Sequence, residues 1–210
     1  MEKKACSIFC AGTYYGYEKP VLGSVVIAAD GGADYLDSLG VKPDLVIGDF
    51  DSSKTAVTDC ENVIKLNPVK DKTDTFEAVE QALALGCGEI HIFGGTGGRS
   101  AHTFANIQTL AMLAEKGVSA YLYGDNEIIT AVHNGKLTFD PSSSGYISVF
   151  SLDTECRDVN IKSLKYTIET AQLTNNYPVG VSNEFTGEAG EISVGEGTLL
   201  VVYTFNAKLK

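Results

Sequence analysis

The sequence has no apolar run that approaches the roughly 18 residues of a membrane-spanning helix. Its start, MEKKACSIFCAG, carries basic residues, but the apolar run that follows is too short for a signal peptide. Basic side chains are also scarce: 16 Lys and Arg stand against 27 Asp and Glu, and the formal net charge is −11 at pH 7. That balance argues against a nucleic-acid or anionic-membrane surface. We therefore expect a soluble cytoplasmic protein, in which an anionic substrate needs a metal ion or local Arg and Lys.

The chain also lacks a C-x-x-C pair, and its cysteines are odd in number: Cys6, Cys10, Cys60, Cys87 and Cys156. This is typical of reduced thiols in a cytoplasmic protein rather than of a disulfide scaffold. A Ser/His/Asp arrangement with a nucleophile turn is missing, as are internal repeats and low-complexity segments. With 210 residues, 44% of them hydrophobic and 20% charged, the chain has the composition of a globular protein with one large or two small domains.

Residues 1–132 alternate short apolar segments with segments of helical periodicity. Strands are expected at 6–12, 24–32, 44–52, 89–95 and 119–125, because each apolar run breaks at Gly as buried parallel strands do. Helices are expected at 33–40, 74–86 and 102–117, each closed by a glycine. In the second helix, Asp74 is the expected N-cap and Glu77 completes a capping box. The alternation predicts an α/β domain with a mainly parallel open sheet and flanking helices.

The pattern changes from residue 133 onward. Short alternating segments typical of strands follow one another, divided by Gly, Asn, Pro and Ser, at 136–140, 145–152, 159–164, 166–173, 179–185, 190–194 and 198–205. Their close spacing predicts an all-β region, a sandwich or a barrel. The predicted fold class is therefore α/β, with an open-sheet domain over 1–132 followed by an all-β sandwich domain over 133–210.

Acidic residues follow the ends of the expected strands. Asp30 comes after the second strand, Asp49 and Asp51 follow the third, and Asp71 and Asp74 stand just before a helix. Ligands of an open α/β sheet bind beyond the carboxyl ends of its strands, so these side chains converge on one edge. Two carboxylates about 4 Å apart repel by roughly 4 kcal/mol at an effective dielectric near 20, and a cation offsets this. Each acid alone suits a turn, a cap or a solvated surface, but together they favour a Mg²⁺ site.

Residues 94–102, GGTGGRSAH, join the fourth expected strand to a helix. Glycine lets the backbone approach an anion closely, and a helix N-terminus donates N–H groups with a favourable dipole. Arg99 adds a permanent charge suited to phosphate, and His102 is either a polar cap residue or a ligand contact. The run lacks the Gly-Lys-Ser/Thr of a P-loop and the spacing of a dinucleotide fingerprint. Alone it is a tight strand-to-helix turn; beside the carboxylates it favours phosphate binding.

Tyrosines cluster in the loop after the first expected strand, at Tyr14, Tyr15 and Tyr17. Their rings could stack on a flat ligand, but loop tyrosines often only cover a core. The sequence leaves both interpretations open.

Four motifs in this order, ADGGADYL, PDLVIGDFDS, KDKTDTFEAV and IFGGTGGRSAHTFANI, resemble those of the thiamine pyrophosphokinase family. The segments SLKYTIE, GVSNEF and GTLLVV are similar to that family's C-terminal domain, so the resemblance spans nearly the whole chain. It implies a homodimeric enzyme that transfers pyrophosphate from ATP to the hydroxyl of thiamine and releases AMP. It also implies Mg²⁺ as cofactor and a thiamine site where the two subunits meet.

The resemblance assigns roles to individual residues as well. Asp49, Asp51 and Asp74 would hold Mg²⁺, and Asp30 and Asp71 would line the same pocket. A carboxylate near the thiamine hydroxyl could take its proton, and we choose Asp71 as this base. Ser182 and Asn183 of the β domain would approach thiamine. ATP would be bound by Asp30, Gly31, Gly94, Gly95, Gly97, Gly98, Arg99 and His102.

One position departs from the family pattern of Arg, any residue, Asp and His, because residues 99–102 are RSAH. Ala101 cannot ligate a metal or accept a proton. A binding-only or weakened homologue that holds ATP and thiamine is therefore an alternative. A NAD-dependent oxidoreductase, with Asp125 after the following strand, is another, but it leaves the carboxylates unexplained. A third is a binding module whose acids are all turn residues and caps. Because every other expected carboxylate is present, we expect an active enzyme.

Overall fold

The computed structural model describes residues 3–16, 23–49, 60–67 and 71–209, and the chain divides into two compact units. One unit comprises Met1–Thr109 with Val118–Asp125, and the other comprises Leu110–Gly117 with Asn126–Lys210. Within the described ranges, no helix has both the length and the apolar character that a membrane crossing requires.

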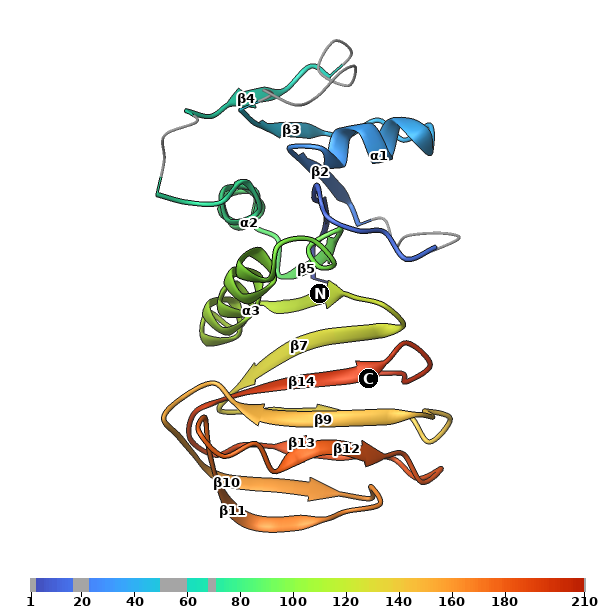
Figure 1. The fold of residues 1–210 in the computed structure, drawn as a ribbon, viewed down its shortest axis with the longest axis vertical. Helices are drawn as coiled ribbons and strands as arrows, with labels where there is room; N and C mark the ends of the chain where they lie inside the picture. The colour runs from blue at the N-terminus through green and yellow to red at the C-terminus, as the bar shows by residue number, and fades with distance from the viewer. Residues whose placement is uncertain (1–2, 17–22, 50–59, 68–70, 210) are drawn as a thin grey trace. The chain divides into compact units, whose positions relative to one another are not determined.

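The first unit is built on a parallel sheet (Figure 1). Its neighbouring strands pair in parallel throughout. β2 (Val25–Ala29) and β3 (Leu45–Gly48) are continuous apolar runs, as expected where both faces of a sheet are covered, and every residue of these two strands is buried. The predicted parallel sheet is confirmed. Across the sheet the order is β6 (Ser119–Tyr123), β5 (Glu89–Phe93), β1 (Ala5–Phe9), β2 (Val25–Ala29), β3 (Leu45–Gly48) and β4 (Val63–Lys65).

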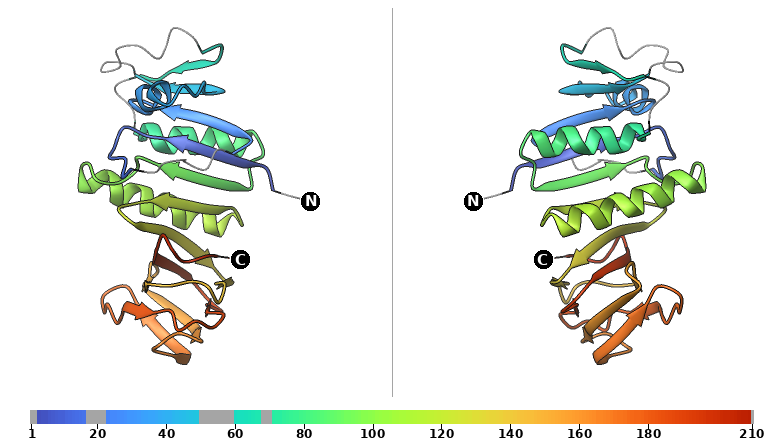
Figure 2. Two further views of the ribbon diagram at one scale, coloured as in Figure 1. Left: turned by 90° about the vertical axis from the view of Figure 1, so that its right-hand side faces the viewer. Right: turned by 90° about the vertical axis from the view of Figure 1, so that its left-hand side faces the viewer.

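Helices lie on both faces of this sheet. α2 (Asp74–Ala84) and the first turns of α3 (Ser100–Glu115) are on one face, and α1 (Gly32–Ser38) is on the other (Figures 1 and 2). The glycines expected to end the helices all have the left-handed φ of a helix terminator: +67° at Gly40, +77° at Gly86 and +72° at Gly117.

The second unit contains two antiparallel sheets. Side chains from both sheets pack into one core, including Val149 and Val201 from one sheet and Val159 and Ile192 from the other. The predicted C-terminal sandwich is confirmed. One sheet has the order β12 (Gly180–Glu184), β9 (Tyr146–Ser151), β14 (Thr198–Thr204) and β7 (Glu127–His133); the other has β11 (Ile168–Thr174), β10 (Glu155–Lys162), β13 (Glu191–Ser193) and β8 (Lys136–Thr138).

The sequence pattern does not predict two of these strands, β4 and β7. β4 spans three residues, and none of them is fully buried, so no apolar run marks it. β7 pairs along its whole length with β14, from His133 opposite Thr198 to Glu127 opposite Thr204. Pairing with a segment so distant in the chain defines this strand, and local periodicity does not report such pairing.

Candidate active site

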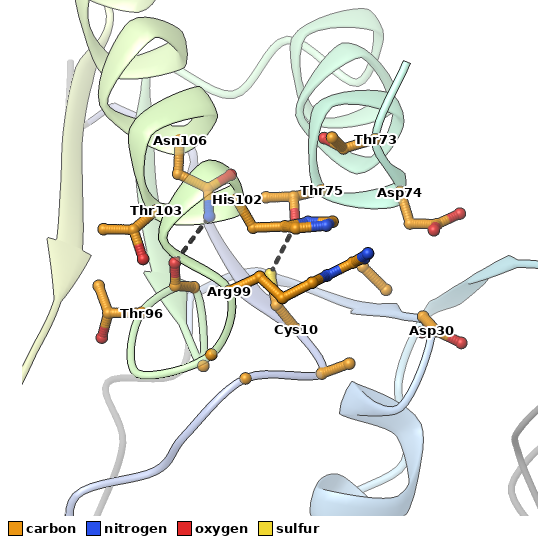
Figure 3. Close-up of a pocket in the computed structure, with 16 residues that line it drawn as sticks. Cys10, Asp30, Thr73, Asp74, Thr75, Thr96, Arg99, His102, Thr103 and Asn106 are labelled. Carbon is orange, nitrogen blue, oxygen red and sulfur yellow. Dashed lines mark hydrogen bonds between the residues drawn. The ribbon is translucent and has the colours of Figure 1, made fainter. Parts of the chain in front are cut away.

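A cavity of about 200 Å³ opens at the carboxyl ends of β1, β2 and β5 in the first unit (Figure 3). Parallel strands place their carboxyl ends at one edge, and the loops and helix N-termini that follow them form the cavity wall. This is the sheet edge at which the sequence predicts converging acids. The wall consists of residues 10–12 after β1, Asp30 after β2, residues 73–75 at the start of α2, the glycine run after β5 and the first turns of α3.

Asp30 enters the cavity wall through a sharp turn. Its φ is 50°, a left-handed value that Asp tolerates better than most residues. Its N–H donates to the Ile47 carbonyl of the neighbouring strand at 2.8 Å, which continues the pairing of β2 with β3. Gly32 allows the chain to bend immediately afterwards, because a Cβ there would collide with the Phe9 carbonyl. The backbone therefore holds Asp30 at the carboxyl edge of the sheet.

Asp74 lines the same cavity from the N-terminus of α2. The prediction that Asp74 is the N-cap and Glu77 completes a capping box is wrong. Thr73 is the N-cap, and its Oγ1 accepts a hydrogen bond from the Phe76 N–H at 3.2 Å. Threonine is a favourable cap in its own right, so Asp74 occupies the first helical position, where the helix dipole favours a carboxylate. Figure 3 shows Asp74 at the same end of the pocket as Asp30.

The glycine run forms the opposite part of the wall. Gly94 and Gly97 have φ of +64° and +76°, so other residues would be strained there. Gly95 is buried, and a Cβ on it would lie 2.6 Å from Leu122 Cδ1. Its carbonyl accepts a hydrogen bond from Asn106 Nδ2 at 2.8 Å, and Asn106 is only 4% exposed. The run is thus fastened to α3, whose first turn stands beside the cavity.

Two basic or titratable side chains complete the rim. Arg99 and His102 both line the cavity and are both exposed. Figure 3 shows the guanidinium of Arg99 extending along the cavity toward the end where Asp74 and Asp30 lie. The cavity therefore has a cation and glycine N–H groups on one side and carboxylates at the other end. This arrangement suits a polyphosphate that carries a bound metal ion.

Cys10 and Thr75 line the buried part of the cavity. Thr75 Oγ1 donates to Cys10 Sγ at 3.3 Å, and both side chains are buried. Burial raises the pKa of the Cys10 thiol to about 12, with a further contribution from the negative charges of Asp74 and Asp30. At neutral pH this group is therefore an uncharged thiol.

The chemistry of the donors in the cavity fits a hard cation. Asp30 and Asp74 provide carboxylate oxygens, the ligand atoms that Mg²⁺ prefers. Asp49 directly follows β3 and is half-buried, outside the cavity lining, and Asp51 lies outside the described residues. Among the residues that the structure describes, no three His, Cys, Asp or Glu side chains gather closely enough to form a metal centre.

The remaining candidates in the first unit lie near the cavity without lining it. Asp71 is exposed in the turn before α2. Gly31 and Gly97 belong to the two loops that form the wall, but their own atoms do not line it. Of the expected nucleotide contacts, Asp30, Gly94, Gly95, Gly98, Arg99 and His102 are brought together around one cavity.

The expected thiamine contacts lie on β12 of the second unit. Asn183 is buried, and its side chain pairs with the backbone of Tyr166: Oδ1 accepts from the Tyr166 N–H at 2.9 Å, and Nδ2 donates to the Tyr166 carbonyl at 2.7 Å. Ser182 is exposed and has a φ of 59°. Asn183 therefore has a structural function in the sandwich, and Ser182 presents its hydroxyl on the surface.

Several cavity residues escape the sequence interpretation. Residues 10–12 could have been indicated by their place at the carboxyl end of the first expected strand, where ligands of such sheets bind. They are not among the predicted residues because none of them is charged. Thr73 and Thr75 flank Asp74, and in the sequence they are indistinguishable from ordinary helix-cap residues. Asn106 carries no local signal, because its importance comes from the bond that its side chain makes back to the Gly95 carbonyl once α3 has formed.

Comparison with known proteins links both units to the same family. Residues 23–122 match the thiamin pyrophosphokinase catalytic domain, and residues 136–199 match the thiamin pyrophosphokinase vitamin B1 binding domain. The chain belongs to the thiamin pyrophosphokinase family. The resemblance drawn from the motifs is confirmed, and with it the prediction of an enzyme of the thiamine diphosphokinase class.

Individual members of the thiamin pyrophosphokinase family agree with this assignment. The thiamine pyrophosphokinase of Bacillus subtilis is 27% identical over 186 residues, which cover 84% of this chain and 85% of that protein. A crystal structure of thiamine pyrophosphokinase from Bacillus subtilis is similar over 96% of this chain and 99% of that chain, with a TM-score of 0.83 and 25% identity. Yeast thiamin pyrophosphokinase shares the fold, with a TM-score of 0.75 at 17% identity over 98% of this chain and 87% of that one.

Proposed function

We propose that the protein transfers a pyrophosphoryl group from ATP to the hydroxyl of thiamine in one Mg²⁺-dependent step, giving thiamine diphosphate and AMP. The observation that supports this most directly is the cavity of the first unit. It joins two carboxylates, Asp30 at the end of β2 and Asp74 at the start of α2, to a glycine run that leads into a helix N-terminus and carries Arg99. Each of these features helps to bind a polyphosphate. They matter especially in a protein of net charge −11, which otherwise repels an anionic ligand.

In this reaction the thiamine hydroxyl oxygen attacks the β-phosphorus of ATP. The bond between the β-phosphorus and the oxygen that bridges to the α-phosphate breaks, and AMP leaves with that oxygen. The hydroxyl proton passes to a base, which we assign to Asp71, an exposed carboxylate in the turn before α2. The glycine run and Arg99 hold the phosphates in line for transfer, because such reactions depend chiefly on positioning and charge.

Mg²⁺ would be held by Asp74 together with Asp49 and Asp51, with Asp30 in the same pocket, and it would neutralise charge on the phosphates. Ser182 and Asn183 would approach thiamine from the sandwich, with domains 1–132 and 133–210 dividing the two substrates. A homodimer with thiamine at the subunit interface, and a cytoplasmic location, belong to the same proposal.

The test is formation of AMP and thiamine diphosphate from ATP and thiamine, with Mg²⁺ and with EDTA. We expect both products in equal amounts with Mg²⁺ and neither with EDTA. If the protein binds ATP and thiamine but releases no AMP, the proposed activity is wrong, and the binding-only alternative that Ala101 suggests is correct. A change in nicotinamide fluorescence on mixing with NADH would instead favour the oxidoreductase alternative. Light scattering after gel filtration tests the dimer, and a monomer would contradict the interface.

A further inference from the structure

The loop of residues 11–16 lies directly against the glycine run. Backbone hydrogen bonds continue the pairing of β1 and β5 past the ends of both strands: the Gly12 N–H donates to the Gly94 carbonyl at 2.7 Å, and the Thr13 N–H donates to the Thr96 carbonyl at 2.9 Å. In a trans peptide the C=O of one residue and the N–H of the next point in opposite directions. The N–H groups of Gly95 and Gly97 therefore face away from loop 11–16.

Tyr14 fixes this loop from within. Its hydroxyl donates to the Cys10 carbonyl at 2.6 Å, and its ring stacks on Tyr35 of α1, with centroids 3.4 Å apart and planes 8° from parallel. The phenol end of the ring lies against the α-carbon of Gly94, because a Cβ there would be 2.8 Å from Tyr14 Cζ. Burial raises the pKa of Tyr14 well above its usual range, so the hydroxyl remains a donor at neutral pH.

Tyr15 makes the corresponding contact further along the run. Its hydroxyl accepts a hydrogen bond from Thr96 Oγ1 at 3.3 Å, and the same Thr96 hydroxyl lies 3.3 Å from the Tyr123 carbonyl. A Cβ on Gly97 would collide with the Tyr15 hydroxyl and the Thr13 side chain. The two tyrosines thus occupy the space next to the two glycines that have positive φ.

We propose that Tyr14 and Tyr15 are positioning residues that hold the glycine run in the shape that binds polyphosphate. Neither side chain lines the cavity, so each acts through the residues of the run that it contacts: Tyr14 through Gly94, and Tyr15 through Thr96 and Gly97. The inference rests on the proposed function, since it assigns the run to the phosphates of the nucleotide.

The physical reason is the freedom of glycine. Because glycine loses more backbone entropy on ordering than any other residue, a run with four glycines within residues 94–98 is costly to order. If the run were mobile, part of the binding free energy of the nucleotide would be used to order it. Contacts that order the run beforehand, on the side away from the ligand, remove that cost without touching the ligand.

The experiment measures the dissociation constant of ADP with Mg²⁺ by calorimetry, using Tyr14→Phe, Tyr15→Phe and the matched control Tyr121→Phe. Tyr121 is a half-buried tyrosine of β6 whose hydroxyl pairs with Ser119 at the amino end of that strand, opposite the edge that holds the cavity. We expect each loop variant to weaken ADP binding about fivefold through one lost hydrogen bond, and Tyr121→Phe to bind as the unaltered protein does. The KM for thiamine should not change in any of the three.

A double-mutant cycle with Thr96→Val sharpens the test. If Tyr15 acts through Thr96, Tyr15→Phe should weaken ADP binding no further in the Thr96→Val background. Unchanged ADP affinity in both loop variants would overturn the inference, as would an equal loss in Tyr121→Phe, which would signify general destabilisation. Failure of the unaltered protein to bind ADP would overturn the proposed nucleotide site itself, a result distinct from loop variants that bind normally.

Discussion

The two units of this protein use their polar side chains in different ways. In the first unit, Asp30 and Asp74 lie at the carboxyl edge of a parallel sheet and line a cavity. In the second unit, the buried Asn183 pairs both ends of its amide with the backbone of Tyr166, and Asp153 accepts from the Thr198 N–H at 2.7 Å. A parallel sheet leaves its strand ends open to a ligand, whereas the sandwich turns its polar groups inward to hold its own loops together.

This difference predicts two kinds of mutational response. Substitutions at the edge of the parallel sheet should reduce turnover while the fold survives. Substitutions of buried polar groups in the sandwich should reduce stability first.

The largest expected effect is that of Asp74→Asn. Loss of the carboxylate should lower kcat/KM for thiamine diphosphate formation by roughly 100-fold or more, since it removes charge stabilisation in the cavity. The melting temperature should change little, because Thr73 and not Asp74 caps α2. Asp37→Asn, at an exposed position of α1, is the matched control and should retain activity. Equal activity in both variants would contradict the assignment of Asp74 to the site.

Within the glycine run, packing differs sharply between neighbours. Gly95→Ala should destabilise the protein by about 1–3 kcal/mol, because the new methyl group meets Leu122 in a closely packed core. At Gly98 a Cβ would enter open space and φ is not positive, so Gly98→Ala should leave the free energy of unfolding unchanged. Urea unfolding of the two variants checks this, and equal stabilities would show that the run is not closely packed.

Asn183→Ala tests the comparison from the side of the sandwich. It leaves the N–H and C=O of Tyr166 without their amide partner and should lower the free energy of unfolding by about 1–3 kcal/mol. Asn175→Ala, at an exposed position, should be neutral. If Asn183→Ala instead raises the KM for thiamine and leaves the stability unchanged, Asn183 is chiefly a ligand contact, and the contrast between the two units fails.

The buried Cys10 thiol predicts a dependence of stability on pH. Its pKa is raised from 9.0 to about 12 by burial, so the folded protein favours the neutral thiol. The corresponding stabilisation is complete below pH 9.0 and is lost as the pH rises toward about 12. In that range, the free energy of unfolding of Cys10→Ala should fall less steeply than that of the unaltered protein, by about 1.4 kcal/mol per pH unit. Identical slopes in alkaline urea titrations would contradict this.

The smallest expected effect is that of Ala101→Asp on stability. The first turn of α3 holds no acidic residue, and Ala101 is exposed there. A carboxylate near a helix N-terminus should stabilise the protein by about 0.3–1 kcal/mol at low ionic strength, and Ala101→Asn should not. The same pair of variants tests the binding-only alternative, since product formation only after Ala101→Asp would support it.

Much of the fold follows from local pattern. Breaks at Gly predict the buried strands of the first unit, and Gly40, Gly86 and Gly117 mark helix ends that the structure confirms. The cap of α2 could not be read in the same way. Thr73 and Asp74 are both good caps and both line the cavity, and only the path of the chain determines which of them bonds to the helix.

The sequence by itself determined the parallel sheet of the first unit, the sandwich of the second, and the family to which the motifs point, because these depend on apolar periodicity, glycine breaks and short motifs. The tertiary structure alone decided that Asn106 fastens Gly95, that Cys10 lies buried beside Thr75, and that Asn183 supports the backbone of Tyr166. Each of these contacts joins residues that are distant in the chain, and a polar side chain carries no local sign of the partner that folding brings to it.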